Sequence, residues 1–361
     1  MRIVVHHEIP EDDNLRQQWN SLVQQMEQPE IFYTYDWALA VYRAYRGSLT
    51  PLLFLVYQDE VLVGVATLAR TSNRKQLSFL AGFTADYCDF ICLPRRRAEV
   101  LSALSRHLRN LNVSNLVLNN LPLDSRTIEA LRADFSGYRI FCRPAYECSQ
   151  VSIRTPEERE AVRRDTGTKR SLRYLKKGRI EVCHHKGYDA IAALLPNFIE
   201  WHVARFGRQS NVALSDRQTF LFQLARQLSS SGWMTLSEML INGQMAGLLI
   251  GFTYARHWLL YQTAFDSNFQ RYSPGFCLVL KLIQEACQSL EFDYLDLGLG
   301  DEVYKTRLTN TSRHTFQVTL AASTFTMLRT AARYHTATTI KRSPRVEHTV
   351  RLLLGRLSSG G

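Results

Sequence analysis

The stretch RYSPGFCLVLKLIQEACQSLEFDYLDLGLGDEVYKTRL, residues 271–308, decides the fold. Apolar residues recur at helical spacing from Phe276 onward, and Pro274 suits the first helical position after the N-cap candidate Ser273. A strand pattern follows at 291–301. The stretch therefore predicts a capped helix that leads into a strand, with acidic, tyrosine and lysine side chains at the end of that strand.

The residues before this stretch predict a β-hairpin at 234–255, with Asn242-Gly243 as its turn, and a further strand at 257–265. The same order of hairpin, strand, helix and strand begins earlier in the chain, with the hairpin at 51–70. We therefore expect one αβ unit to occur twice. The predicted fold class is α/β (α+β), with mixed central sheets flanked by helices.

The repeat divides the chain into a first half at 1–150 and a second half at 151–325, followed by a basic helical tail at 326–361. Helical patterns at 156–178 and 191–206 lie early in the second half. No low-complexity linker separates the halves, so we expect them to pack closely together.

The composition fits a folded chain rather than a disordered one, because 45% of the 361 residues are hydrophobic and 21% are charged. The N-terminal residues MRIVVHHEIPEDD lack the basic start and apolar centre of a secretory signal. The apolar runs are strand-sized and far shorter than the ~20 residues that span a bilayer. These features predict a cytoplasmic protein, either free or peripheral at the inner membrane face.

The seven cysteines are scattered and form no C-x-x-C pair. An odd number of cysteines in a long chain argues against a disulfide framework. No histidine stands near them at the spacing of a metal site. We therefore expect reduced cysteines in the core and no bound metal.

The formal net charge of +11 is concentrated in two segments. Residues 327–361 hold seven lysines or arginines against one glutamate, and KRSLRYLKKGR at 169–179 holds six basic residues and no acid. Each segment is either a solvated helix face or a contact for an anionic partner, such as a membrane surface or an RNA backbone.

Four motifs carry a family resemblance: RYSPGFCLVLKLIQEA at 271–286, DLGLGDEVYKTRL at 296–308, RSLRYLKKG at 170–178 and FYTYDWALAVYRAY at 32–45. Together they resemble the CelD-like (cellulose biosynthesis) branch of the GNAT acyltransferases, which is related to the tandem-GNAT Fem aminoacyltransferases. The resemblance implies two GNAT-like acyl-CoA N-acyltransferase units in tandem. The matching positions in the second half are Ser273, Pro274, Gly275, Gly300, Asp301, Tyr304, Lys305 and Arg307.

The resemblance implies an acyl-CoA donor, either acetyl-CoA or another acyl-CoA, bound at the start of the second-half helix. Backbone N–H groups at a helix N-terminus bind phosphate, and Gly275 allows a ligand to approach them closely. Arg271 and Ser273 complete this predicted donor site, for which the alternative is a plain N-cap. The common GNAT pyrophosphate loop is not intact, and Leu308-Thr309 replace the family's Phe-Gly, so an aminoacyl-tRNA donor is a second hypothesis.

Acyl transfer needs a proton acceptor, a proton donor for the leaving group and groups that hold the substrates. Asp296 and Asp301 bracket the end of the last strand, where either carboxylate is a candidate base or ligand for a cationic acceptor. Tyr304 is the candidate proton donor, and Lys305 is the candidate partner of a phosphate or carboxylate. The alternatives are solvent exposure for Asp296, a turn or helix cap for Asp301 and a surface position for Lys305.

Two further regions are expected to face the same cleft: the strand before the helix, and the predicted helix at 191–206. His202 is a candidate general base, against the alternative that this helix packs into the core. The predicted substrate-binding residues are Tyr261, Asp266, His202 and Arg205.

Together these features predict an acyltransferase that moves an acetyl or acyl group from acyl-CoA to an amine or hydroxyl of a small polar or sugar-derived acceptor. The resemblance implies a role in envelope or exopolysaccharide biosynthesis. The competing hypotheses are a Fem-like aminoacyl-tRNA-dependent transferase and a catalytically degenerate GNAT-fold scaffold that binds a membrane or a partner.

Overall fold

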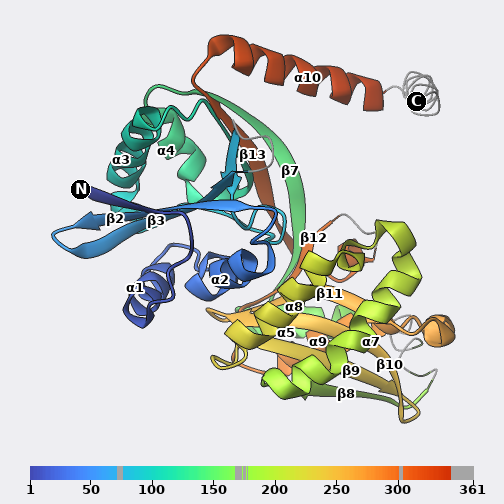
Figure 1. Ribbon diagram of the computed structural model, residues 1–361. Helices are drawn as coiled ribbons and strands as arrows, with labels where there is room; N and C mark the ends of the chain where they lie inside the picture. Colours follow the sequence, from blue (N-terminus) through green and yellow to red (C-terminus); the bar gives the residue numbers. More distant parts are fainter. Residues whose placement is uncertain (71–75, 167–172, 174–175, 177, 301–303, 343–361) are drawn as a thin grey trace, which may run out of the picture.

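The fold is built around one mixed sheet to which both halves of the chain contribute, as Figure 1 shows. The computed structural model describes residues 1–70, 76–166, 173, 176, 178–300 and 304–342. From one edge to the other, its strands are β1 (Arg2–His6), β2 (Thr50–Gln58), β3 (Val61–Arg70), β4 (Gln76–Phe79), β6 (Asn115–Pro122), β13 (Thr311–Ala321), β7 (Arg139–Ser152), β12 (Tyr294–Leu299), β11 (His257–Phe265), β10 (Gln244–Tyr254), β9 (Met234–Ile241) and β8 (Ile180–His185), with β5 (Ile91–Cys92) beside β3.

Helices flank the sheet, as the sequence predicted, and α10 extends beyond it at the top of Figure 1. Across the described residues, no helix has both the length and the apolar composition needed to cross a bilayer. Of the predicted helix at 156–178, the structure describes Pro156–Thr166 as a helix, and most of the following residues lie outside the described part. The helices are α1 (Asp13–Gln24), α2 (Tyr35–Ala44), α3 (Arg97–Asn110), α4 (Thr127–Asp134), α5 (Pro156–Thr166), α7 (Tyr188–Phe206), α8 (Ser215–Leu228), α9 (Pro274–Gln288) and α10 (Thr324–Arg342).

The sheet contains the repeated unit that the sequence predicted. Each unit has a hairpin (β2–β3 and β9–β10), a strand antiparallel to it (β4 and β11), a helix (α3 and α9) and a strand parallel to the previous one (β6 and β12). The residues at the two hairpin turns, Asp59-Glu60 and Asn242-Gly243, have the positive φ angles of a tight hairpin. In each unit the parallel pairing covers only three residue pairs and stops before β6 or β12 ends.

The two halves are joined by an exchange of strands. β7 follows the first unit in the chain but pairs with β12 of the second unit, and β13 follows the second unit but pairs with β6 of the first. β7 and β13 also pair with each other and run between the halves in Figure 1. The predicted boundary between residues 150 and 151 therefore falls inside β7.

An aromatic core around Trp37 of α2 forms much of the interface between the halves. The fully buried Trp37 ring makes edge contacts with Phe220 of α8, Phe252 of β10 and Tyr261 of β11, at centroid distances of 5.6, 5.2 and 5.8 Å. Edge contacts of this kind add to the free energy gained by burying the rings. The cluster therefore helps to fix the first half against the second.

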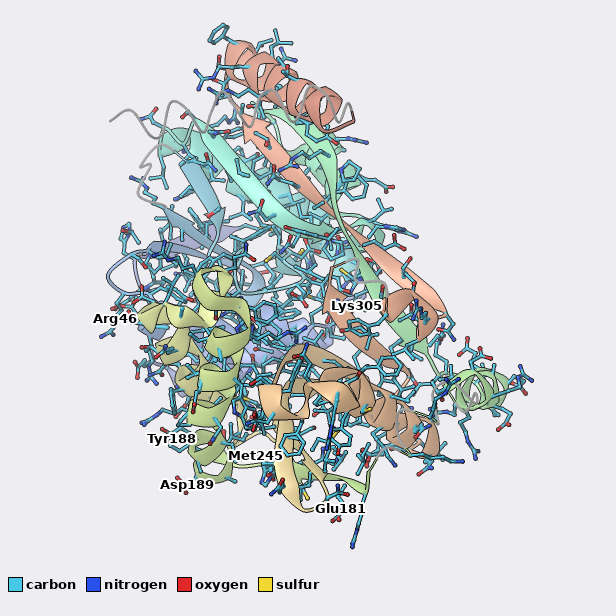
Figure 2. The ribbon with its side chains drawn as sticks, turned by 90° about the vertical axis from the view of Figure 1, so that its right-hand side faces the viewer. Arg46, Glu181, Tyr188, Asp189, Met245 and Lys305 are labelled. Carbon is cyan, nitrogen blue, oxygen red and sulfur yellow. The ribbon has the colours of Figure 1, made fainter. Side chains whose placement is uncertain are left out.

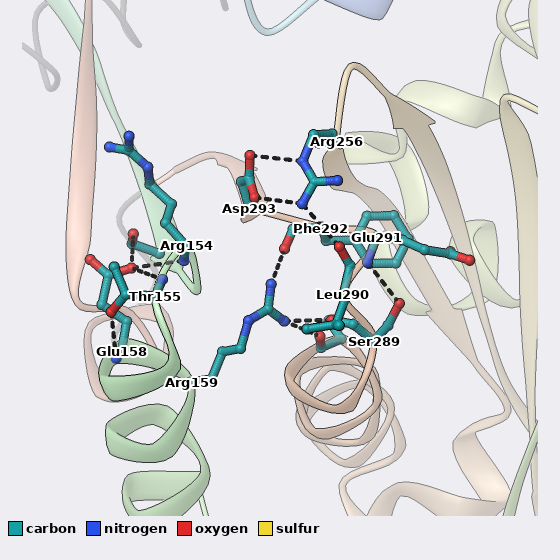
Figure 3. A network of polar contacts seen from close by, with 12 residues as sticks. Arg154, Thr155, Glu158, Arg159, Arg256, Ser289, Leu290, Glu291, Phe292 and Asp293 are labelled. Atoms are coloured by element: carbon teal, nitrogen blue, oxygen red, sulfur yellow. Dashed lines mark hydrogen bonds and ion pairs between the residues drawn. The ribbon is translucent and has the colours of Figure 1, made fainter.

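A polar network at the junction of α9 and β12 holds these two elements in place (Figure 3). The buried Arg159 of α5 donates hydrogen bonds to the carbonyl oxygens of Ser289 and Phe292. Carbonyl groups at a helix C-terminus lack partners within the helix and favour a nearby cation. Arg256 fixes the same loop through Asp293, with an Nη2–Oδ1 distance of 2.9 Å.

Candidate functional site

The candidate site begins where β11 and β12 stop pairing. Their last paired residues are Leu259 and Asp296, and the strands diverge beyond them. A cavity of about 200 Å³ occupies this gap. Strand edges that do not pair with each other can accept an extended ligand between them. We call it the smaller cavity, to distinguish it from a larger one described below. Its lining includes His202, Gln262, Thr263, Leu297, Tyr304 and Lys305.

Two of the predicted catalytic residues, Tyr304 and Lys305, therefore line the smaller cavity. Lys305 is 3% exposed, so it is not the surface lysine of the alternative interpretation, and it lies near the middle of the molecule in Figure 2. Its Nζ donates to the carbonyl oxygen of Leu299 at 2.8 Å, at the end of β12. The Tyr304 ring packs edge-on against Phe276 of α9. Asp301 lies outside the described residues.

Asp296 is buried, contrary to the alternative that it faces solvent. Its Oδ2 accepts hydrogen bonds from the Tyr87 hydroxyl at 2.5 Å and from Gln150 Nε2 at 2.8 Å. Its Oδ1 accepts from the backbone N–H of Gly298 at 2.8 Å. Among the described residues Asp296 does not line the smaller cavity, and its carboxylate instead holds the irregular stretch of β12 between Asp296 and Leu299.

A larger cavity of about 590 Å³ opens beside the smaller one, and both are lined by Tyr261, Gln262 and Leu299. Residues from both halves of the chain line it. The two cavities thus meet at the diverging ends of β11 and β12, which allows two substrates to be held in contact. The charged residues of the larger cavity are Asp86, Arg143 and Arg217.

Asp86 is a candidate catalytic residue that the sequence analysis missed. It lies in the loop between β4 and β5, where its carboxyl lies against Gly298 and near the backbone of Leu299. Burial and the neighbouring Asp296 carboxylate raise the pKa of Asp86 to about 7, although the charge of Lys305 opposes them. Such a carboxyl can accept a proton at neutral pH. Its only signal in the sequence is an acid within a largely apolar stretch.

The loop that carries Asp86 also closes the equivalent gap in the first half. Beyond the pairing of β6 with β4, the Cys88 N–H donates to the Asn120 carbonyl oxygen at 2.9 Å, and the Asn120 side chain donates to the Ala85 carbonyl oxygen at 2.8 Å. On its other side, the loop accepts a hydrogen bond from the Tyr261 hydroxyl. The first-half gap is thus filled by the chain itself, and the same loop supplies a carboxyl to the second-half gap.

His202 lines the smaller cavity as a neutral imidazole. Its Nε2 lies 2.8 Å from Gln262 Nε2, and its Nδ1 lies 2.8 Å from Ser210 Oγ. Because an amide nitrogen only donates, Nε2 is the acceptor and Nδ1 carries the proton. Burial and the charges of Arg205 and Arg217 lower the pKa of His202 to about 4. So weak a base favours a positioning role over proton abstraction.

The other predicted substrate-binding residues separate into two groups. Tyr261 lies where the cavities meet, and its hydroxyl accepts a hydrogen bond from Arg217 Nη2 at 2.7 Å. Asp266 instead caps the short helix η6 (Ser267–Tyr272) by accepting from a backbone N–H at 2.8 Å. Arg205 is exposed and lies over an aromatic ring. Within the described residues, Asp266 and Arg205 line neither cavity.

The predicted donor residues lie at the start of α9. Ser273 occupies the N-cap position with a φ of 55°, and its side chain makes no cap hydrogen bond, unlike the side-chain cap that was expected. A Cβ built on Gly275 would meet no atom closer than 3.8 Å, and one of its two neighbours is Thr263 of the smaller cavity. Packing therefore does not require glycine here, and its small size leaves room beside the gap. Arg271 is exposed on the preceding turn.

Other expectations concern metals, cysteines and the basic segments. Within the described part of the chain, no group of three or more His, Cys, Asp or Glu residues is arranged to hold a metal ion. All seven cysteines are free, and five of them are buried as expected, whereas Cys183 is exposed and Cys142 is half-buried. Most of the segment 169–179 and all of 343–361 lie outside the described residues, so their contacts with a membrane or RNA stay predictions.

Comparison with known proteins identifies the fold. Residues 162–306 match the family model of an acetyltransferase (GNAT) domain, and a search of curated proteins gave no match. Among solved structures, FemX is 10% identical, with 88% of this chain and 97% of FemX covered at a TM-score of 0.58. A tandem GNAT protein from the clavulanic acid biosynthesis pathway is 13% identical, with 89% and 98% covered at a TM-score of 0.53.

The C-terminal domain of a putative lysylphosphatidylglycerol synthetase from Agrobacterium fabrum is 9% identical, with 91% of this chain and 96% of that domain covered at a TM-score of 0.57. At such low identities, the likeness establishes the fold alone. The chain therefore has a mixed α/β GNAT fold shared with tandem GNAT proteins, whereas the CelD-like branch stays a hypothesis.

Proposed function

We propose that this chain, which has the GNAT acyltransferase fold, transfers an acyl group from an acyl-CoA to an amine or hydroxyl of a small polar or sugar-derived acceptor. The acyl arm of the donor lies in the gap between β11 and β12, and the acceptor occupies the larger cavity. One observation carries the proposal: the two cavities meet at Tyr261, Gln262 and Leu299, beside the carboxyl of Asp86.

The chemistry requires one proton to leave the acceptor and another to reach the leaving group. The acceptor nitrogen or oxygen attacks the thioester carbonyl carbon, and Asp86 takes its proton. The tetrahedral intermediate collapses with cleavage of the carbon–sulfur bond, and the CoA sulfur takes a proton from the Tyr304 hydroxyl. Solvent then removes the proton from Asp86 and restores that of Tyr304. Lys305 holds the end of β12 through the Leu299 carbonyl oxygen and adds positive charge beside the gap.

The donor phosphates lie at the start of α9 in this proposal. Backbone N–H groups and the helix dipole favour an anion there. Because Gly275 has no side chain, the phosphates can approach the backbone N–H groups at the start of α9. The exposed Arg271, four residues earlier, adds a positive charge for these phosphates. The closure of the first-half gap by the loop at 84–88 supports a donor site in the second half.

Calorimetric titration with acetyl-CoA and longer acyl-CoAs tests the donor site. We expect micromolar binding that is lost in Gly275→Trp, because the indole would block the start of α9. Gly47→Trp is the matched control, since a Cβ at Gly47 meets no atom within 4 Å. If no CoA thioester binds the native chain, the proposal fails and the aminoacyl-tRNA hypothesis gains support.

A further inference from the structure

The larger cavity holds a buried positive charge without a counter-charge in contact. Arg217 of α8 is 7% exposed and lines the cavity, and within the described residues it forms no ion pair. Its Nη2 donates to the Tyr261 hydroxyl, and Tyr45 lies close to it, but its Nε is buried without a hydrogen-bond partner. Burying a guanidinium in this way is costly unless an anion approaches it.

The rest of the lining suits an anionic ligand with a polar nucleophile. Arg143 adds a second guanidinium, held by Gln317 with an Nε–Oε1 distance of 2.7 Å. Among the described lining residues Asp86 is the only acid; burial raises its pKa to about 7, and the charge of Arg217 opposes that shift without forming an ion pair with it. Where the cavities meet, Gln262 Oε1 is buried without a partner. The unpaired donor Arg217 Nε and the unpaired acceptor Gln262 Oε1 thus belong to residues that line the same cavity.

We propose that the acceptor carries an anionic group, a carboxylate or a phosphate, which binds Arg217 while its nucleophilic N–H or O–H bonds Gln262 Oε1. The inference rests on the proposed acyl transfer and narrows its acceptor to an anionic amine or alcohol. The hydrogen bond to Tyr261 holds the guanidinium in place before the ligand arrives. A guanidinium recognises both carboxylate and phosphate through parallel hydrogen bonds, so the two anions must be separated by experiment.

Matched acceptor pairs test this inference on the native chain. L-alanine is compared with L-alaninamide to test a carboxylate, and glucosamine 6-phosphate with glucosamine to test a phosphate, by the acceptor-dependent release of CoA from acetyl-CoA. We expect kcat/KM to be at least about tenfold higher for the anionic member of one pair, which also identifies the anion. Equal kcat/KM values within both pairs would overturn the inference, while the release of CoA would leave the acyltransferase function standing.

Variants of Arg217 test whether this residue causes the preference for the anionic acceptor. Arg217→Gln should remove the preference for the anionic member, and Arg217→Lys should keep part of it. Arg226→Gln is the matched control, because Arg226 lies on the same helix, is exposed and stacks on Tyr188 away from the cavity. A preference that persists in folded Arg217→Gln would contradict the assignment to Arg217.

Direct binding keeps the inference testable if none of these compounds is acylated. Calorimetric titration of L-alanine and glucosamine 6-phosphate needs no donor and no turnover. Binding of one of them that is weakened at least about tenfold in Arg217→Gln, and by less in Arg217→Lys, relative to Arg226→Gln would support the anion site. No binding of either compound to the native chain, together with no turnover, would overturn it. Failure to bind any acyl-CoA is a separate result, which bears on the proposed function.

Discussion

The carboxyl of Asp86 lies against the α-carbon of Gly298: a Cβ built on this glycine would be 2.8 Å from Asp86 Oδ2. Gly298 has a φ of +72°, a conformation that glycine adopts without strain. Its N–H is held by the Asp296 side chain. The irregular stretch of β12 at Gly298 therefore admits the Asp86 carboxyl because glycine has no side chain.

Gly298→Ala should disrupt the candidate site more than it disrupts the fold. The new methyl group both strains the backbone, at a cost of about 1–2 kcal/mol, and displaces the Asp86 carboxyl. Gly232→Ala is the control, since Gly232 has a φ of +67° but a Cβ there meets nothing within 4 Å. We expect both variants to lose unfolding free energy, Gly298→Ala more than Gly232→Ala because of the added clash, but only Gly298→Ala to lose CoA release. Equal rates of CoA release in Gly298→Ala and Gly232→Ala would show that Asp86 takes no part in catalysis.

Asp86→Asn should remove the proton acceptor. Because the carboxylate is the active form and the pKa of Asp86 is about 7, kcat/KM of the native chain should rise as the pH increases through about 7. In the variant we expect this rise to be absent and kcat/KM at about pH 8 to fall by roughly 10²–10⁴-fold. The measurement is CoA release between about pH 5.5 and pH 9. A variant that kept the native pH profile would point to another base.

The same substitution should change how stability depends on pH. The pKa of Asp86 is raised from 3.8 to about 7, so between these values the native state keeps a proton that the unfolded state has lost. The unfolding free energy therefore falls as the pH rises through this window, by at most about 1.4 kcal/mol per pH unit, and levels off above about pH 7. Denaturant unfolding should show Asp86→Asn gaining stability relative to the native chain from about pH 4 to about pH 8. A constant difference would contradict the raised pKa.

Gly275→Ala should weaken donor binding without destabilising the fold. A Cβ at this position meets its neighbours only at ordinary contact distance, and alanine has a higher helix propensity than glycine. We expect the unfolding free energy to stay the same or rise by up to about 1 kcal/mol, while the Kd for acyl-CoA increases by about tenfold or more. Calorimetry checks the Kd, with Gly47→Ala as control. An unchanged Kd would place the donor phosphates elsewhere.

The His202 imidazole should stay neutral throughout the physiological pH range. Burial, Arg205 and Arg217 lower its pKa from 6.5 to about 4, so between these values the unfolded state binds a proton that the native state excludes. His202 therefore contributes stability above about pH 6.5 that is lost as the pH falls toward 4. NMR titration of the imidazole ring, assigned with His202→Gln, measures the pKa directly. A value near 6.5 would restore His202 as a candidate general base.

Local patterns were enough to predict the repeated unit. The turn at Asn242-Gly243, the helix beginning at Pro274 and the strand at 257–265 all depend on neighbouring residues, and the structure confirms each of them. The placement of Tyr304 and Lys305 at the gap follows from the same local order, because both come just after the strand that ends there.

The rest of the candidate site depends on contacts between distant parts of the chain. Asp86 reaches β12 only because its loop fills the gap between β4 and β6 in the first half. The residues near Asp86 in the sequence do not predict the course of this loop. Asp296 alternates with apolar neighbours, which suggested an exposed side chain, but Tyr87 and Gln150 cover it with hydrogen bonds from the first half and from β7. The exchange of β7 and β13 is likewise a property of the whole sheet.

The exchange of β7 and β13 also constrains how the chain folds during synthesis. β13 occupies the position between β6 and β7, so the sheet of the first half has unpaired strand edges until residue 321 has left the ribosome. Unpaired edges of this kind invite aggregation of nascent chains. The first half therefore cannot complete its native sheet early in translation, and the protein depends on a late step that closes both halves together.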